Sequence, residues 1–250
     1  NVRLGASRTI SRPDLNELSP SPALEYLGGL QVAGNPALHR ATIDNYDARV
    51  EAFPSLGEVV AAGVFLKRMH EPIEQVIQGG APPILVPRNS DSAVNRGMEL
   101  EMRLGLGRIA RMLDRFAVNA NASFIHSEVT LKKQLSKLGS ERHPLAGQAD
   151  VLSNVALSAR LLGGRADATV LVGHVGKRLR TLGLFPSPDV YQQPVTTLDA
   201  TLNWNPSTRL RVKLAGKNLL DPRIQDLQLG KEVSGFRRGR TVTLVFTYGG

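Results

Sequence analysis

The stretch TLDATLNW, residues 197–204, alternates strictly between polar and apolar residues. A turn signature follows at residues 205–208, Asn-Pro-Ser-Thr, and the alternation resumes in RLRVKL, residues 209–214. Successive strand residues point to opposite faces of a sheet, so each stretch has one apolar face and one polar face. These residues therefore predict a β-hairpin whose two faces meet different surroundings.

The same alternation recurs along the whole chain. Its clearest instances are residues 2–7, 45–52, 98–104, 116–124, 154–161 and 241–248. Two less regular β-rich segments lie near residues 58–70 and 165–180. Together with the first hairpin, these segments predict about ten strands.

The links between the predicted strands alternate in length. Outer-membrane barrels have this rhythm because their periplasmic turns are short and their extracellular loops are long. We therefore predict an all-β fold, an antiparallel meander of about ten strands of a transmembrane β-barrel, in which each strand pairs with its sequence neighbour. The short links fall near residues 54–57, 107–115, 162–165 and 205–208, and the long ones near 10–40, 73–91, 131–149, 181–193 and 222–237.

Charge indicates which face of this sheet would meet lipid. Arg209, Arg211 and Lys213 share one face, and an Arg or Lys that faces lipid at mid-membrane costs about 2–4 kcal/mol. Three such residues on one strand predict that their face lines the lumen. The alternative is a half-buried sheet of a soluble protein, with the charged face in water. The residues expected to line the lumen are Asp47, Arg49, Glu51, Glu99, Glu101, Arg103, Asp199, Arg211 and Lys213.

Composition excludes several other kinds of protein. Lys and Arg number 31 against 22 Asp and Glu, a net charge of +9, and 42% of the residues are apolar, which indicates a folded chain. The absence of cysteine excludes a disulfide scaffold, a thiolate zinc site and a cysteine nucleophile. The longest apolar run, residues 59–66, is shorter than the roughly 18 residues that a membrane-spanning helix needs.

Two kinds of ligand are not favoured by the sequence. The five histidines are not spaced as metal ligands on one element, so we predict neither a metal nor a cofactor. The pI of about 10.2 would suit a nucleic-acid partner. However, the charge is spread over alternate strand positions without a recognition motif, so we predict no nucleic acid.

Several short stretches, in this order along the chain, resemble the barrels of TonB-dependent outer-membrane receptors. The first are SRTISRPDLNEL at residues 7–18, GNPAL at 34–38, DNYD at 44–47 and FLKR at 65–68. The others are NSDSA at 89–93, GMELE at 97–101, PLAGQ at 144–148, KNLLDP at 217–222 and GRT at 239–241.

This resemblance implies a location, a larger architecture and a function. Residues 1–250 would be the C-terminal portion of a barrel of about 22 strands with a plugged lumen, in the outer membrane of a Gram-negative bacterium. The N-terminal plug, the first strands and the segment that engages the TonB complex would be absent from this chain. The function would be active uptake of a bulky, scarce nutrient, such as a ferric siderophore, a cobalamin or a glycan, without covalent chemistry. The charged residues expected to line the lumen would hold and release the plug; the alternative is that they are only solvated by water in the lumen.

The remaining expectations concern partners and rival classes. The nutrient would contact the extracellular loops, chiefly residues 10–40 and 73–91. A passive porin-like barrel, or a ten-stranded outer-membrane barrel that includes a surface enzyme near Glu141, His143 and Asp150, is the alternative. We expect an open wall, because a ten-stranded bore would crowd the lumen charges. Besides outer-membrane lipid, lipopolysaccharide phosphates would contact Lys132, Lys133, Lys137, Arg142, Arg237 and Arg238 unless these are solvated charges.

Overall fold

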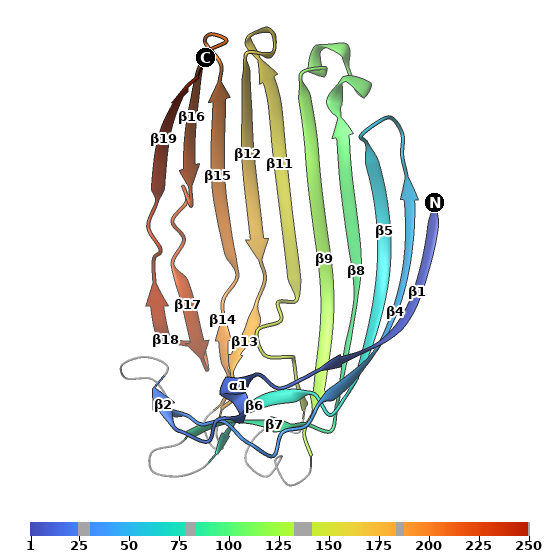
Figure 1. Ribbon diagram of the computed structural model, residues 1–250, viewed down its shortest axis with the longest axis vertical. Helices are drawn as coiled ribbons and strands as arrows, with labels where there is room; N and C mark the ends of the chain where they lie inside the picture. Colours follow the sequence, from blue (N-terminus) through green and yellow to red (C-terminus); the bar gives the residue numbers. More distant parts are fainter. Residues whose placement is uncertain (25–30, 79–83, 133–141, 184–187, 250) are drawn as a thin grey trace.

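The chain forms one large open sheet (Figure 1). The computed structural model describes residues 1–24, 31–78, 84–132, 142–183 and 188–249. Ten strands follow one another in chain order, each antiparallel to the next, and this confirms the predicted meander. They are β1 (Val2–Ser11), β4 (Ala41–Ala52), β5 (Val59–His70), β8 (Ser92–Gly105), β9 (Phe116–Thr130), β11 (Val151–Leu161), β12 (Ala166–Val175), β15 (Val195–Trp204), β16 (Leu210–Lys217) and β19 (Thr241–Tyr248).

Short links lie at one end of the sheet and long links at the other, as the sequence predicts (Figure 1). Three short 3-10 turns lie in the short links: η1 (Leu106–Arg108), η2 (Arg111–Leu113) and η3 (Leu162–Gly164). Gly57 and Gly163 adopt φ values of 80° and 64° there, which side chains disfavour. None of the helices in the described ranges is long and apolar enough to cross a bilayer.

The long links contain structure that the sequence analysis did not anticipate. A second sheet has the order β2-β3-β7-β6, and a third continues the wall in the order β13-β14-β17-β18. The elements are α1 (Leu15–Leu18), β2 (Ala23–Leu24), β3 (Gln31–Val32), β6 (Ile73–Gln78), β7 (Ile84–Asn89), β10 (Arg142–His143), β13 (Arg178–Thr181), β14 (Val190–Gln192), β17 (Ile224–Gln228) and β18 (Lys231–Phe236).

One pair departs from the predicted antiparallel pairing with sequence neighbours. β3 and β7 pair in parallel over two residues each, with Gln31 opposite Ile84 and Val32 opposite Leu85. The two strands come from different long links, so no hairpin dictates their relative direction. Strands this short carry no periodic signal in the sequence, and only the folding of the two links onto each other brings them together.

Register places most of the large apolar residues of the ten strands on one face. Directly paired residues share a face, so the row Val50–Ala62–Leu100–Ala122 can be followed across four strands. Many large side chains on this face are exposed, Phe246 to 65%. A soluble sheet would bury such a face, whereas lipid would cover it favourably. The same face carries Leu198, Leu202, Leu210, Val212, Leu214, Val242, Leu244 and Phe246.

Burial shows onto which face the long links fold. Near the loop end of β8 and β9, the odd-numbered residues are buried and the even-numbered ones are exposed. The covering chain includes Leu145, whose N–H donates to Ser127 Oγ at 3.0 Å. The links therefore pack on the polar side of the wall, which we call the inner face, and the apolar side is the outer face. The buried residues are Ala93, Asn95, Ser127 and Val129, and the exposed ones are Val94, Arg96, His126 and Glu128.

Candidate functional site

All the charged residues predicted to line the lumen lie on the inner face. Asp47, Arg49 and Glu51 project from β4 on the same side as Glu99, Glu101 and Arg103 of β8, because both rows share odd-numbered positions of β5 as partners. The register through β9, β11 and β12 brings Asp199 of β15 to this side, and β16 adds Arg211 and Lys213. The structure thus distributes them over one continuous surface.

A chain of ion pairs crosses four strands on this surface. Arg49 Nε lies 2.8 Å from Glu51 Oε1, and Arg49 Nη2 lies 2.5 Å from Glu101 Oε2. Arg3 Nη2 of β1 reaches Glu51 Oε2 at 3.0 Å and extends the chain to the sheet edge. The sequence analysis missed Arg3, although the alternation of residues 2–7 puts it on the polar face; the register then places it opposite Arg49.

Small residues on β5 make this crossing possible. Ala61 stands between Glu51 and Glu101, and Gly63 stands between Arg49 and Glu99. A Cβ atom added at Gly63 would lie 3.3 Å from the Ala48 carbonyl oxygen and 3.6 Å from Arg49 Cβ. Arg49 therefore lies over β5, and Glu51 and Ala61 are only 7% and 4% exposed.

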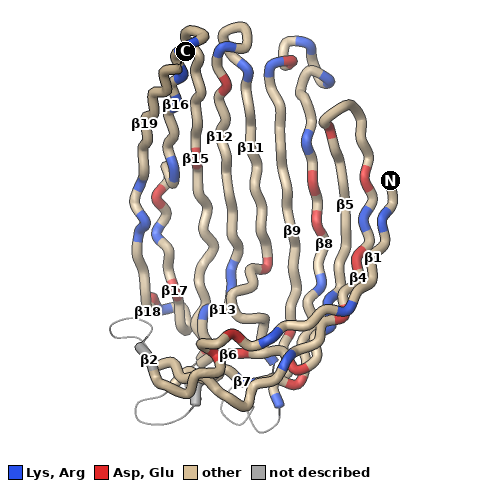
Figure 2. The backbone as a smooth tube through the Cα atoms, viewed as in Figure 1, with Lys and Arg blue, Asp and Glu red and all other residues tan. Residues whose placement is uncertain are grey.

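The other half of the inner face is mostly neutral. Figure 2 shows charged residues crowded on β1, β4 and β8 and sparse along β9, β11 and β12. Asn154 Nδ2 donates to Asn121 Oδ1 at 3.1 Å, and the hydroxyls of Ser158 and Thr169 lie 3.0 Å apart. Asp199 accepts the Asn218 N–H at 2.8 Å and so holds the start of the next link. The wall therefore combines a charged strip with an amide and hydroxyl strip.

A second polar cluster joins three long links at the loop end. Glu71 Oε1 lies 2.8 Å from Lys132 Nζ, and Glu71 Oε2 lies 2.6 Å from His39 Nε2. Hydrogen bonding to Lys132 and to His39 lowers the pKa of the Glu71 carboxyl, Lys132 having the larger effect. Asn89 donates to the backbone carbonyls of His39 and Glu71. The partners lie 32 and 61 residues from Glu71 in the chain, so local patterns gave no sign of this cluster.

Glu74 of β6 is the most strongly perturbed acid in the described chain. Its side chain is buried, and burial raises the pKa of Glu74 to about 7. β6 pairs with β7, whose Pro87 and Val86 are also buried, in the small sheet at the loop end. Near neutral pH this carboxyl is therefore protonated in a large fraction of molecules.

The described basic residues that were predicted to contact lipopolysaccharide lie in two places. Lys132 and Arg142 lie at the loop end, whereas Arg237 and Arg238 lie between β18 and β19, along the wall, and several of these residues have acidic neighbours (Figure 1). Lys132 is paired with Glu71, and Arg142 Nη1 lies 3.6 Å from Glu128 Oε1. Arg237 donates to the Asp221 carbonyl oxygen. Arg238 is exposed, whereas Lys133 and Lys137 fall outside the described residues.

The residues considered for a surface enzyme do not form a described site. Glu141 falls outside the described residues, and His143 is buried, with Nδ1 2.8 Å from the Pro144 carbonyl oxygen. The Asp150 N–H bonds to the Lys177 carbonyl oxygen, and the Asp150 carbonyl oxygen accepts the Ile125 N–H, so this residue helps join β9, β11 and β12.

Comparison with known proteins places this architecture among receptor barrels. A family model described as TonB dependent receptor-like, beta-barrel, matches residues 1–219. None of the curated proteins matches the sequence.

Solved structures resemble the chain over almost its whole length. A double mutant of the ferric enterobactin receptor PfeA from Pseudomonas aeruginosa has a TM-score of 0.65 at 19% identity, covering 99% of this chain and 38% of that one. The ferric yersiniabactin uptake receptor FyuA from Yersinia pestis has a TM-score of 0.63 at 16% identity, covering 99% of this chain and 34% of that one. The FrpB iron transporter from Neisseria meningitidis has a TM-score of 0.57 at 15% identity, covering 87% of this chain and 31% of that one. The chain thus spans between 31% and 38% of these three structures.

Proposed function

Because the chain belongs to the family of TonB-dependent receptor-like β-barrels, we propose that it is part of an outer-membrane receptor that takes up a ferric siderophore. Receptors of this family are transporters of the Gram-negative outer membrane. One observation carries the proposal: long links fold over the inner face at one end of a wall whose outer face is apolar and exposed. A ligand held by those links would stand at the entrance to the lumen.

The wall would work as part of a larger barrel. In this proposal residues 1–250 are the C-terminal portion of a barrel of about 22 strands, and a plug domain, the first strands and the TonB-binding segment precede them. The chain spans 38% of the PfeA structure, which supports this arrangement.

The charged strip would be the surface that holds the plug. The chain Arg3–Glu51–Arg49–Glu101 presents guanidinium and carboxylate groups on the inner face, where polar groups of a plug can form hydrogen bonds with them. Such contacts exchange readily for water, so a plug can be released when TonB pulls on it. The neutral strip of Asn, Ser and Thr would line the path that opens.

The ligand class is inferred from the solved relatives. PfeA and FyuA are named as receptors of ferric enterobactin and ferric yersiniabactin, and FrpB as an iron transporter. These names favour a ferric siderophore over a cobalamin or a glycan for this chain. The nutrient would meet the links that contain α1, β6 and β7, and the Glu71 cluster would keep these links together.

Uptake of labelled nutrients tests the proposal. The complete protein is expressed in a Gram-negative strain that lacks its own siderophore receptors, with and without TonB, and is offered a panel of ferric siderophores, cyanocobalamin and maltooligosaccharides. We expect saturable uptake of at least one ferric siderophore that disappears without TonB. Uptake that persists without TonB and does not saturate would instead indicate the passive porin. Uptake of cobalamin or glycan alone would refute the proposal that the transported nutrient is a ferric siderophore.

A further inference from the structure

Large apolar side chains stand exposed at the short-link end of the wall. Leu56 lies in the β4–β5 link, Ile109 and Met112 lie in the β8–β9 link, and Leu162 lies in the β11–β12 link. Ile109 and Met112 are 77% and 80% exposed, and the other two are also exposed. Turns favour Gly, Pro, Asn, Asp and Ser, so the need to reverse the chain does not explain these apolar side chains.

The backbone at Leu162 supports the same conclusion. Leu162 has a φ of 51°, in the left-handed region where a side chain is disfavoured and glycine fits without strain. The next two residues, Gly163 and Gly164, also have positive φ values, and as glycines they adopt them freely. A strained residue that keeps an exposed apolar side chain indicates a function beyond the folding of its link.

Hydrogen bonds tie these neighbouring links into one connected edge, at the top of the view in Figure 1. Arg108 Nη2 donates to the Pro54 carbonyl oxygen at 3.0 Å and lies 3.2 Å from Glu58 Oε2. The Arg160 N–H donates to the Arg115 carbonyl oxygen at 2.8 Å, which joins the β8–β9 link to β11. The exposed side chains are therefore presented on a preformed surface. We call the set Leu56, Ile109, Arg111, Met112, Arg115 and Leu162 the short-link rim.

The three links carry a net positive charge. Between their flanking strands they contain four arginines, two acids and no lysine. The arginines are Arg108, Arg111, Arg115 and Arg165, and the acids are Glu58 and Asp114. Among the described residues, Arg108 is the only one of the four arginines that forms an ion pair. The charges of the other three arginines remain available to an acidic partner.

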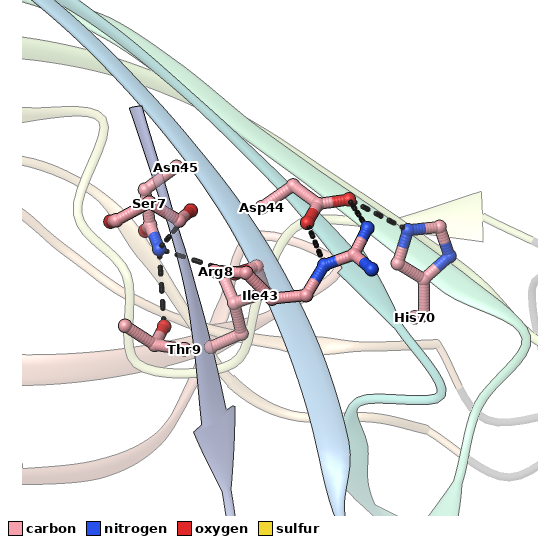
Figure 3. A network of polar contacts seen from close by, with 7 residues as sticks. All are labelled: Ser7, Arg8, Thr9, Ile43, Asp44, Asn45 and His70. Carbon is pink, nitrogen blue, oxygen red and sulfur yellow. Dashed lines mark hydrogen bonds and ion pairs between the residues drawn. The ribbon is translucent and has the colours of Figure 1, made fainter. Parts of the chain in front are cut away.

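An arginine near the loop end shows the opposite arrangement. Arg8 Nε and Nη2 lie 2.5 and 3.0 Å from the two carboxylate oxygens of Asp44, and His70 Nε2 lies 3.3 Å from Asp44 Oδ2 (Figure 3). The guanidinium of Arg8 is therefore compensated within the chain, by a charge-assisted bidentate pair. Arg111 and Arg115 of the rim have no such carboxylate in the described structure.

The rim lies beyond the apolar belt of the outer face. Phe116 and Trp204 stand on that face at the short-link ends of β9 and β15, and such aromatic residues mark the boundary between lipid and water. Ile109 and Met112 precede Phe116 in the link, past this boundary and on the periplasmic side of the proposed topology. Arg and Met are enriched and Lys is depleted at protein–protein interfaces, as in these links. A protein is therefore favoured over a lipid surface as the partner.

We propose that the short-link rim docks a soluble periplasmic protein that carries the ferric siderophore onward, through an acidic surface of that carrier set around apolar residues. Ile109, Met112 and Leu162 pack against the apolar residues, and Arg111 and Arg115 pair with the surrounding carboxylates. A carrier held at the exit of the lumen meets the nutrient at a high effective concentration before it diffuses away. The inference rests on the proposed function, because the cargo of the carrier is the nutrient of the receptor.

Binding of a purified carrier to the complete receptor tests the docking. The probe is the periplasmic ferric-siderophore-binding protein of the same organism, and the receptor is held in phospholipid nanodiscs for biolayer interferometry. We expect the charge reversal R111E/R115E to weaken binding about tenfold or more. Raising the salt concentration from about 0.1 M to about 1 M should weaken binding by wild type more than binding by this variant.

Two further variants separate the apolar contribution from a general effect of charge. I109S/M112S keeps every charge and should also weaken binding about tenfold or more, because the apolar contacts are lost. The matched control is R68E/R96E, which reverses two exposed arginines on β5 and β8 near the loop end and should bind like wild type. TonB-dependent uptake by each variant, in cells that lack the carrier, verifies that the variant is folded.

Photo-crosslinking distinguishes a protein partner from the bilayer. With a benzophenone amino acid in place of Ile109, we expect an adduct with the carrier in the same nanodiscs. Adducts with phospholipid alone would place the rim in the bilayer and overturn the proposal, as would equal binding by wild type and a folded R111E/R115E variant. If the wild type transports a ferric siderophore but does not bind the carrier, the docking is refuted and the proposed function stands. If it transports none, the proposed function fails, and the carrier assigned here fails with it.

Discussion

Replacing Arg49 with Met tests whether the inner-face ion pairs stabilise the wall. The substitution keeps an unbranched side chain over β5 but removes the guanidinium that bonds to Glu51 and Glu101. The two carboxylates differ in burial, since the Glu51 side chain is 6% exposed and the Glu101 side chain is 35% exposed. The consequences should therefore differ between the two partners.

The magnitude follows from that difference. Removing one partner of a buried ion pair costs about 3–5 kcal/mol because the other charge is left uncompensated. Arg3 still contacts Glu51 Oε2 at 3.0 Å and offsets part of this, so we expect Arg49→Met to lower the free energy of unfolding by about 2–3 kcal/mol. Glu101→Gln removes a charge that water reaches, so we expect a loss of about 1 kcal/mol or less.

Urea unfolding in detergent micelles, followed by the fluorescence of Trp204, measures these changes. Arg211→Met is the matched control, because Arg211 is exposed on the same face, and it should change the free energy by less than about 0.5 kcal/mol. The double variant R49M/E51Q removes the uncompensated charge and should recover at least half of the loss. If Arg49→Met costs no more than Arg211→Met, or if Glu51→Gln does not relieve it, the reasoning is wrong.

Three further predictions follow from other parts of the chain. A Cβ atom added at Gly97 would lie 2.4 Å from the Phe124 carbonyl oxygen and 2.7 Å from Phe65 Cζ, whereas the nearest atom to a Cβ at Gly5 would be 3.8 Å away. In the same urea assay, Gly97→Ala should therefore lower the free energy of unfolding by about 2 kcal/mol or more. The control Gly5→Ala should lower it by less than about 0.5 kcal/mol. Glu71 has a lowered pKa in the folded state, so its stabilisation of the links is complete above the unfolded pKa of about 4.3 and is lost as pH falls through the folded pKa. Limited proteolysis of the long links should therefore accelerate at acidic pH. Glu71→Gln should remove this pH dependence, because cleavage would then be fast at neutral pH as well. The change in stability with pH has the opposite sign for Glu74. Its pKa is raised to about 7, so the folded state loses stability as pH rises from about 4.3 through 7. Glu74→Gln should be more stable than wild type at pH values above that range, and a variant with an unchanged pH profile would contradict the burial of an ionisable carboxyl there.

Most of the wall could be predicted from the sequence because its signals are local. The alternation in residues 197–204 specifies a strand and its two faces at once, and Arg211 beside Leu210 and Val212 indicates which face avoids lipid. The short links were also placed, since turn residues such as Pro206 and Gly163 mark them directly. The charged residues of β4 and β8 could be assigned to one face because alternation carries through each strand.

The contacts among those residues, and the arrangement of the long links, were decided only by the tertiary structure. Arg49 meets Glu101 because the β4–β5 and β5–β8 registers together bring these two residues to neighbouring positions on one face. A one-residue slip in either register would separate them. His39, Glu71 and Lys132 meet, and β3 pairs in parallel with β7, because separate links fold onto each other. Periodicity determines the direction of a side chain relative to its own strand, whereas the neighbour it meets is set by register and by loop folding, which depend on contacts between residues distant in sequence.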